Sequence, residues 1–188
     1  MAWLPREPPA PVEVAPPMVL EAPEPPAAPW LHPRASVRSS FDAGTLPGGD
    51  VGLGFAAGAG IGDDWEVEAA GTWWATRFAS AGGDVGAEVG LLAASGRLCW
   101  RYACVGAEVG RMTGRAVELM NGRDAALSWA AVTAGGRWRV AVWDQVDLVV
   151  DAGIAVAVDR PTFELMDGTE AFRPTPVGAR LGVALEIR

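Results

Sequence analysis

Residues 51–61, VGLGFAAGAGI, decide the fold of this chain of 188 residues. Their odd-numbered positions hold Val, Leu, Phe, Ala, Ala and Ile, whereas their even-numbered positions hold only Gly and Ala. Such alternation predicts a β-strand with one apolar face and one nearly bare face. Residues 177–187 alternate in the same way, with charged residues among the small ones. Strands of about ten residues with this pattern are typical of a membrane-spanning β-barrel.

The composition favours strands over helices as membrane-spanning elements. The chain has a formal net charge of −8, and all its cationic side chains apart from histidine are arginines. It contains no apolar run of about 18 residues, the length that a transmembrane helix needs. Its most apolar stretch, residues 146–158, is interrupted by Asp147 and Asp151 and is better interpreted as a strand. The sequence also lacks a basic patch, so we expect no nucleic-acid partner.

Residues 1–34 differ in composition from the rest of the chain. Eleven of the fifteen prolines lie in this segment. A segment so rich in proline cannot bury a core and is predicted to be a disordered tail. Its acidic, Pro-rich character favours a periplasmic spacer, with either a periplasmic protein partner or no specific partner. Residues 1–6 do not open a secretory signal, so we expect the export signal to lie outside this numbering.

Residues 35–188 are predicted to form an all-β domain, an eight-stranded antiparallel up-and-down transmembrane β-barrel. Eight is the smallest usual number of strands in such a barrel. The strands are predicted at 36–45, 51–62, 65–77, 85–99, 104–117, 126–142, 146–160 and 174–187. Short turns are expected at 62–64, 100–103 and 144–145, and longer loops at 78–84, 118–125 and 164–172.

Two of the longer loops carry the turn dipeptides Asn121-Gly122 and Asp167-Gly168. Both favour a type I′ hairpin, because its two central positions need positive φ. We therefore expect the flanking strands to extend beyond the membrane as ordered hairpins. Short turns at one rim and long loops at the other are typical of outer-membrane barrels. Both chain ends fall at the short-turn rim, which places the Pro-rich tail in the periplasm.

Alternation alone does not decide which face of each strand meets lipid. The polar positions are rich in Gly and Ala, which suit a narrow lumen better than a water-exposed strand surface. The charges at these positions have both signs, and they would have to pair if they were enclosed. The predicted lumen charge network comprises Arg38, Asp42, Glu66, Glu68, Glu88, Glu108, Arg137, Arg139, Asp151, Arg180 and Glu186.

Aromatic residues gather near the predicted strand ends, as they do in the girdles at the two membrane interfaces. Trp65 and Trp73 are eight positions apart. At a rise of about 3.3 Å and a tilt near 40°, this spacing corresponds to about 20 Å along the membrane normal. The apolar band between girdles is roughly 25 Å tall. The girdles are predicted to contain Trp65, Trp73, Trp138, Trp143 and Phe163.

Three segments, residues 51–61, 65–74 and the closing PTPVGARLGVALEIR at 174–188, make the chain resemble a known class. The chain resembles the small eight-stranded outer-membrane β-barrels of Gram-negative bacteria, with the OmpA/OmpX-type architecture. The resemblance is architectural, and it implies an outer-membrane location with membrane lipid around the strands. Such barrels commonly end on an aromatic residue, whereas this chain ends on Ile187-Arg188.

Little catalytic or metal-binding chemistry is present in the predicted barrel. Cys99 and Cys104 flank a predicted periplasmic turn, where an oxidising compartment favours a disulfide over two buried thiols. The single histidine, His32, falls in the predicted tail, so we expect no histidine-based site in the barrel. Glu66 and Glu68 share one strand face and could serve a two-carboxylate mechanism, although pairing with lumen arginines is the simpler interpretation. We expect no cofactor and no metal ion.

The sequence therefore favours a non-enzymatic, monomeric outer-membrane barrel with a structural or anchoring role. The interior of an eight-stranded barrel is narrow enough for side chains to fill. A lumen plugged by Trp74, Trp129 and the charges is accordingly expected. Two rivals remain, a membrane-embedded enzyme that uses the lumen carboxylates and a soluble lipocalin-like barrel that binds a small apolar ligand. The lipocalin alternative predicts shielded side chains at Leu53, Phe55, Val183 and Leu185.

Overall fold

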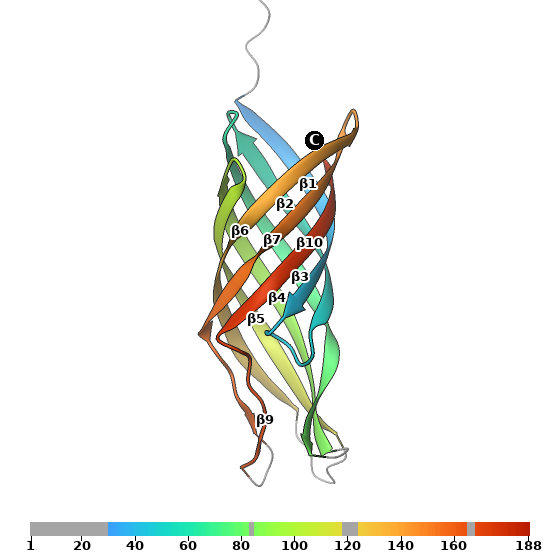
Figure 1. The fold of residues 1–188 in the computed structure, drawn as a ribbon, viewed down its shortest axis with the longest axis vertical. Coiled ribbons are helices and arrows are strands. Elements are labelled where there is room, and N and C mark those ends of the chain that lie inside the picture. Colours follow the sequence, from blue (N-terminus) through green and yellow to red (C-terminus); the bar gives the residue numbers. More distant parts are fainter. Residues whose placement is uncertain (1–29, 83–84, 118–123, 165–167) are drawn as a thin grey trace, which may run out of the picture.

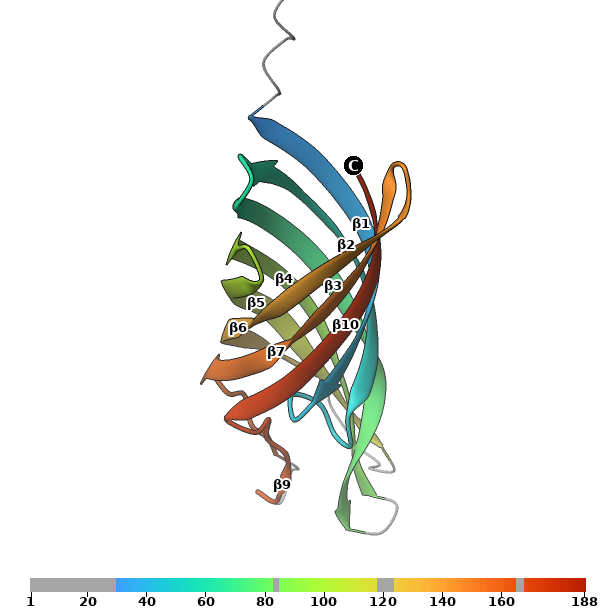
Figure 2. The same cartoon turned by 45° about the horizontal axis from the view of Figure 1, so that its top comes forward.

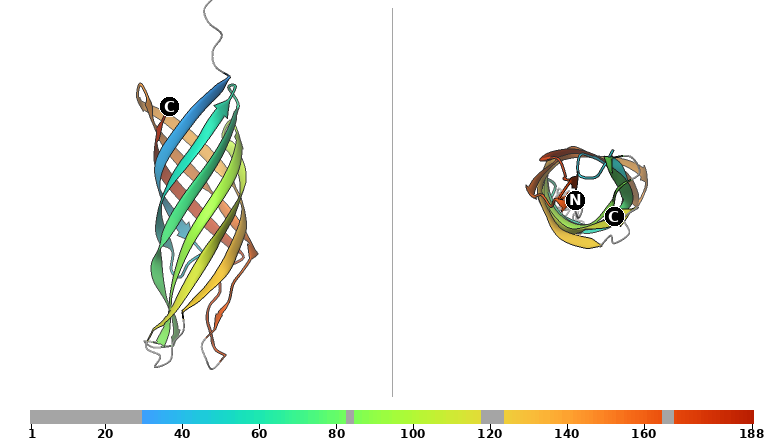
Figure 3. Two further views of the ribbon diagram at one scale, coloured as in Figure 1. Left: turned by 180° about the vertical axis from the view of Figure 1, so that it is seen from behind. Right: turned by 90° about the horizontal axis from the view of Figure 1, so that it is seen from below.

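A computed structural model describes residues 30–82, 85–117, 124–164 and 168–188. Eight antiparallel strands form a closed ring in the order β1-β10-β7-β6-β5-β4-β3-β2, which confirms the predicted fold (Figures 1 and 3). The barrel strands are β1 (Leu31–Ala43), β2 (Asp50–Ile61), β3 (Trp65–Gly82), β4 (Val85–Trp100), β5 (Ala103–Val117), β6 (Ala125–Trp143), β7 (Val146–Asp159) and β10 (Val177–Ile187). Within the described ranges, no helix is long and apolar enough to cross a membrane.

Two strands differ most from their predicted bounds. β1 begins at Leu31, five residues earlier than predicted, so His32 and Arg34 are strand residues rather than part of the preceding segment. β1 pairs with β2 as far as Leu31↔Ile61, and this pairing extends the strand through Pro33. β3 continues to Gly82 through a register shift after Trp74, beyond the predicted end at residue 77. Residues 1–29 lie outside the described residues.

The connections separate into two rims, as the sequence predicts. Turns at 62–64, 101–102 and 144–145 lie at the rim where β1 begins and β10 ends, which we call the turn rim. This rim is uppermost in Figure 1. The longer connections lie at the opposite loop rim, where β3 and β4 project beyond their neighbours (Figure 2).

The connection between β7 and β10 carries a small hairpin of its own. β8 (Phe163–Glu164) pairs antiparallel with β9 (Glu170–Phe172). Gly168, between these strands, has a φ of +82°, a conformation that glycine adopts without strain. The predicted turns at Asn121-Gly122 and at Asp167 lie outside the described residues.

The outer surface of the barrel is apolar, and the small and charged positions face inward. In β2 the odd-numbered residues point outward and the even-numbered ones inward. Leu53, Phe55, Val183 and Leu185 are 57%, 70%, 50% and 53% exposed, respectively. The lipocalin-like alternative required these four side chains to be shielded, and it is therefore wrong.

Inward glycines let neighbouring strands approach closely on the concave side of the wall. A Cβ added at Gly54 would lie 2.3 Å from the carbonyl oxygen of Gly71, and one at Gly58 would lie 2.3 Å from that of Val67. Atoms cannot approach so closely without a shift of the backbone, so the glycines of residues 51–61 serve strand packing as well as lumen space.

Candidate functional site: the filled interior of the barrel

The half of the interior near the turn rim contains a continuous network of ion pairs, which we call the turn-side network. Its cations come from β1, β4, β6 and the chain end, and its anions from β3, β7 and β10. Its members are Arg34, Arg38, Arg97, Arg137, Arg139, Arg188, Glu66, Glu68, Asp147, Asp151 and Glu186.

Arg137 lies at the centre of this network and its side chain is 2% exposed. Its guanidinium donates to Glu66 and, at 2.6 Å, to Oε2 of Glu68. Arg139, two residues along β6, donates to Oε2 of Glu66 at 2.8 Å and to Oε1 of Glu186 at 2.8 Å. Alternation along one strand therefore aims two arginines at the carboxylates of the facing strands.

Glu66 and Glu68 have no carboxylate oxygen left without a hydrogen bond. Both oxygens of Glu66 accept from Arg137 and Arg139. The oxygens of Glu68 accept from Arg38 on one side and from Arg97 and Arg137 on the other. A two-carboxylate mechanism needs one carboxyl group free to reach a substrate, and this arrangement offers none.

A second, smaller cluster lies closer to the loop rim, and we call it the loop-side cluster. Arg180 of β10 donates to Oδ2 of Asp42 at 2.8 Å and to Oε2 of Glu108 at 2.6 Å. The indole of Trp129 donates to Oε1 of Glu108 at 2.8 Å. Asp42 also accepts from the backbone N–H of Thr45 at 2.7 Å, which fixes the start of the β1–β2 connection.

The charges of these two clusters balance. The turn-side network contains six arginines and five carboxylates, and the loop-side cluster contains one arginine and two carboxylates. Seven cations therefore face seven anions. Because charges removed from water are tolerated only when they are paired and hydrogen-bonded, this balance permits so many ions inside one barrel.

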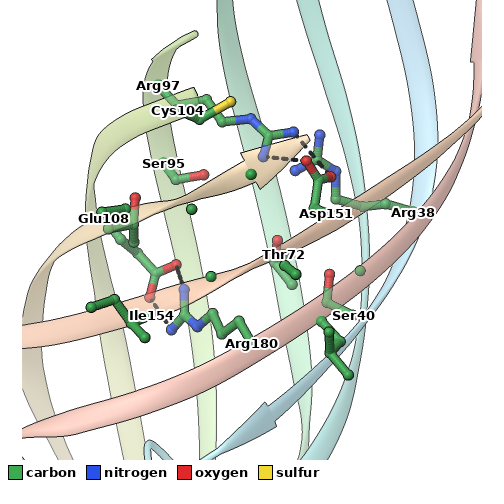
Figure 4. Close-up of a pocket in the computed structure, with 18 of the residues that line it drawn as sticks. Arg38, Ser40, Thr72, Ser95, Arg97, Cys104, Glu108, Asp151, Ile154 and Arg180 are labelled. Carbon is green, nitrogen blue, oxygen red and sulfur yellow. Dashed lines mark hydrogen bonds and ion pairs between the residues drawn. The ribbon is translucent and has the colours of Figure 1, made fainter. Parts of the chain in front are cut away.

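A cavity of about 120 Å³ separates the two clusters (Figure 4). Arg38, Arg97 and Asp151 line it from the turn side, and Glu108 and Arg180 line it from the loop side. Its remaining polar lining consists of the hydroxyl side chains Ser40, Thr72, Ser95 and Thr133. At about 30 Å³ per water molecule, the cavity has room for roughly four waters.

Beside the loop-side cluster and the buried Asp50, which accepts from Nε of Arg77 at 2.8 Å, the half of the interior near the loop rim is filled mainly by apolar side chains. Val89 and Met112 are fully buried, and Trp74 and Trp129 pack in the same cluster. Two further members, Leu46 and Phe163, come from the loop connections. We call this set the apolar plug; its described members are Leu46, Trp74, Ala79, Ala87, Val89, Leu91, Ala93, Met112, Trp129, Ala131, Ala155, Phe163 and Ala171.

The comparison with solved structures agrees with this architecture. No protein-family model matches the sequence, and no curated protein matches it. A major outer membrane protein from Thermus thermophilus superposes with a TM-score of 0.54 at 13% identity, covering 82% of this chain and 99% of that one. The chain has the fold of a small outer-membrane β-barrel. The resemblance stated from the sequence is thus confirmed at the level of the fold.

Two other solved barrels are similar over comparable lengths. Neisserial surface protein A has a TM-score of 0.45 at 10% identity and covers 85% of this chain and 97% of its own. Ail, the attachment invasion locus protein of Yersinia pestis, has a TM-score of 0.46 at 12% identity and covers 84% and 97%.

The barrel brings ten of the eleven predicted lumen charges into the two clusters, and Glu88 is the exception. Glu88 shares the outward parity of β4 with Leu92 and Leu98, and its side chain is exposed. Its assignment to the lumen is wrong because β4 turns its odd-numbered residues inward, as the buried Val89 and Leu91 show.

Four members of the turn-side network were not predicted: Arg34, Arg97, Asp147 and Arg188. The sequence places Arg34 in the Pro-rich tail, but it lies in β1 and donates to Glu186 at 3.0 Å. Arg97 and Asp147 share strand parity with residues that face inward, so a strict parity count along β4 and β7 would have found both.

Four of the five predicted girdle residues point outward. Trp65, Trp73, Trp138 and Trp143 are between 47% and 65% exposed. Phe163 is 5% exposed, and the prediction that it belongs to a girdle is wrong. Its ring fills the space beside Gly114 of β5, where an added Cβ would lie 2.4 Å from Cδ1 of the ring. β8 thus directs this aromatic ring into the barrel mouth.

The predicted disulfide is present between Cys99 and Cys104, whose Cα atoms are 4.0 Å apart. The two cysteines face each other across the β4–β5 turn at the turn rim. Beside it, the exposed Arg101 donates to Oδ1 of Asp64 at 2.9 Å, and this hydrogen bond raises the pKa of Arg101.

Only one group of carboxylates among the described residues lies close enough to be considered for a metal ion. Oxygens of Glu66, Glu68 and Glu186 lie within 4.8 Å of one another. Arginines already donate to these oxygens, and Arg137 lies against all three side chains. A cation there would meet the guanidinium charges, so the geometry fits an ion-pair network and not a metal centre.

Proposed function

We propose that this chain is a non-enzymatic, monomeric protein of the outer membrane whose barrel is closed to ions and serves as a structural element or anchor. The observation that carries this proposal is the reversal of polarity across one wall, with apolar side chains outside and paired charges inside. The Pro-rich segment then lies on the periplasmic side, where it reaches a periplasmic protein partner.

The outer surface supports a lipid environment. Thirty large hydrophobic residues are exposed among the described residues, which far exceeds the scattered apolar residues on the surface of a soluble monomer. At about 25 cal/mol per Å² of apolar surface, exposure of these residues to water would cost tens of kcal/mol. Lipid contact removes this cost, and closure of the ring satisfies the backbone in the membrane.

The interior supports a closed lumen. An ion moving along the axis would have to cross both the turn-side network and the apolar plug. The first obstacle consists of paired charges, whose separation leaves buried ions uncompensated. The second consists of packed apolar side chains that offer an ion no ligand. The cavity between them is small and does not by itself form a passage.

Two features support the anchoring role, namely the ion pairs that occupy the carboxylates inside the barrel and the Pro-rich segment that precedes the barrel. The carboxylates of the turn-side network are engaged by arginines, so they provide no free general acid or base. Residues 1–29, which precede the barrel, follow a Pro-rich pattern that suits a spacer. A closed barrel attached to a spacer holds the spacer at the membrane surface.

Cell fractionation and gel mobility test the membrane assignment. We expect the full-length protein in the outer-membrane fraction, with a migration that changes on boiling. Recovery as a soluble, monomeric protein whose migration does not depend on heating would refute the proposal.

Planar-bilayer recording tests the closed lumen. We expect no steady conductance from the reconstituted barrel. The variant Arg137→Ala provides a matched comparison, since it removes the arginine at the centre of the turn-side network. A stable open channel in the unchanged protein would contradict the closed lumen while leaving the membrane assignment intact.

Protease accessibility tests the orientation of the Pro-rich segment. In intact cells, residues 1–29 should resist an added protease, and they should be cleaved once the outer membrane is permeabilised. Cleavage in intact cells would place the turn rim outside the cell and would remove the periplasmic role.

A further inference from the structure

An apolar groove runs over the lipid-facing surface of β2, β3, β4 and β5. This open groove has a volume of about 850 Å³ and is lined by Leu53, Phe55, Trp73, Leu92 and Val109. The floor is low because Gly71 and Ala94 are cross-strand neighbours that contribute little side chain. The groove is therefore a depression between large side chains on the outer surface of the barrel.

The single charged side chain that lines this groove is Arg111 of β5. It is exposed and shares the outward parity of Val105 and Val109. Its cross-strand neighbours are Leu92 on β4 and Ser128 on β6. No carboxylate of the described residues pairs with Arg111, in contrast to the arginines of the interior.

Arg111 lies at the loop-rim end of the apolar band. It follows Ala103, at the start of β5, by eight residues. With a rise of about 3.3 Å and a tilt near 40°, this corresponds to about 20 Å along the barrel axis, close to the height of the band. Beyond it, Thr113 and Arg115 continue the same outward face, so β5 changes from apolar to polar at Arg111.

We infer that the groove binds one membrane lipid with an anionic phosphate headgroup, whose acyl chain lies along Leu53, Phe55 and Trp73 and whose phosphate meets Arg111. This inference rests on the proposed membrane location. A guanidinium forms paired hydrogen bonds with phosphate oxygens, and such charge-assisted bonds strengthen where water is scarce. The phosphate supplies an anionic partner for Arg111, which pairs with no carboxylate among the described residues.

Arg115 is less suited to this role because Glu88 lies directly opposite it in the β4–β5 register. The carboxylate of Glu88 on the same outer face offers Arg115 an acidic neighbour within the protein. Arg111 lies four residues closer to the turn rim along β5, and its cross-strand neighbours are Leu92 and Ser128. It shares a polar depression of the surface with Glu88 and Asp124 but forms no ion pair with either.

A second copy of the chain is a poorer occupant than a lipid. If two barrels met across this groove, the facing surface would be the same apolar face. Each Arg111 would then be covered without a carboxylate partner, and an unpaired buried charge is costly. A lipid avoids this cost, because its phosphate pairs with Arg111 while its acyl chain covers the apolar lining of the groove.

Native mass spectrometry of the folded barrel, released from detergent micelles with added phosphatidylglycerol or phosphatidylcholine, tests the site. We expect retention of one phosphatidylglycerol and at least about tenfold weaker retention of the zwitterionic lipid. Arg111→Gln removes the charge at similar size, and its matched control is Arg101→Gln on the turn rim. Ala94→Leu fills the groove, and its matched control is Ala179→Leu, another outward alanine on β10.

The site is supported if Arg111→Gln and Ala94→Leu each lower retention of phosphatidylglycerol about tenfold while both controls retain it. Equal retention by all variants means non-specific lipid contact and overturns the inference. A dimer mass that Ala94→Leu converts to a monomer identifies a second copy as the occupant and also overturns it. Heat-modifiable migration in every variant shows that the barrel is folded, and failure of the unchanged protein to fold in micelles would instead count against the membrane assignment.

Discussion

The two halves of the barrel interior are filled by side chains of different polarity. The turn-side network fills its half with charges from facing strands. The other half is filled mainly by the apolar plug, with Met112 and Val89 at full burial, and the small loop-side cluster lies beside it. Both halves are enclosed by the same eight strands and the same alternation. The strand pattern therefore fixes which side chains face inward, but it does not fix whether the inner filling is polar or apolar.

The two halves also differ in which segments of the chain supply their side chains. The turn-side network is completed by residues of the strands and the chain end, since its members lie in β1, β3, β4, β6, β7 and β10 or at Arg188. The apolar plug needs the connections as well, because Leu46 and Phe163 come from loop segments that fold back over the mouth. We therefore expect the two halves to respond differently to single substitutions.

The largest loss of stability is expected from Arg137→Met. This change leaves the buried carboxylates of Glu66 and Glu68 short of a cation, and loss of one partner from a buried ion pair costs about 3–5 kcal/mol. Urea unfolding of the detergent-solubilised barrel, followed by heat-modifiable mobility, measures the loss. Adding Glu66→Gln to Arg137→Met should restore part of the stability, whereas Glu88→Gln on the outer face should have no effect. Equal losses for Arg137→Met and Glu88→Gln would refute the network.

A smaller loss, about 3 kcal/mol, is expected from Met112→Ala in the apolar plug. Met112 is fully buried, so its truncation removes apolar contacts and leaves a cavity. The matched change is Val109→Ala, three residues away on the lipid face, where lipid chains adjust and no cavity forms. If both variants unfold at the same urea concentration, the loop-side half is not a packed core.

Gly114→Ala tests how tightly Phe163 fills the mouth. The new methyl group would collide with the ring, and overpacking of this kind costs about 1–3 kcal/mol. Gly96→Ala is the control, because a Cβ at Gly96 meets nothing within 4 Å. The same unfolding assay should separate the two variants. If Gly114→Ala were as stable as the unchanged protein, Phe163 would be able to leave the barrel mouth without loss of stability.

The smallest effect is expected at the turn rim, from replacing both Cys99 and Cys104 by serine. The disulfide closes a segment with a sequence separation of only 5, and the unfolded chain gains little freedom when so short a loop opens. We expect a loss of about 1–2 kcal/mol in the unfolding assay and unchanged outer-membrane recovery. A barrel that fails to assemble without the disulfide would show that this turn has a larger role than its loop length indicates.

How far the sequence could predict the interior depends on the strand. In β2 and β10 the two parities differ so strongly that their inner and outer faces could be assigned directly. In β4 both parities are apolar, with Val89 and Leu91 on one and Leu92 and Leu98 on the other. The pattern therefore does not show that Glu88 faces outward, and of the apolar plug it indicates only Trp74 and Trp129.

The sequence by itself determined the eight strands, the two kinds of rim, the disulfide and most of the lumen charges. It did so because alternation with a period of two and the residue preferences of turns are local properties. Only the tertiary structure decided that Arg34 joins the network, that Phe163 enters the mouth and that Arg111 borders a groove. These facts depend on which strands become neighbours and on how loops fold back, and residues far apart in the chain settle both.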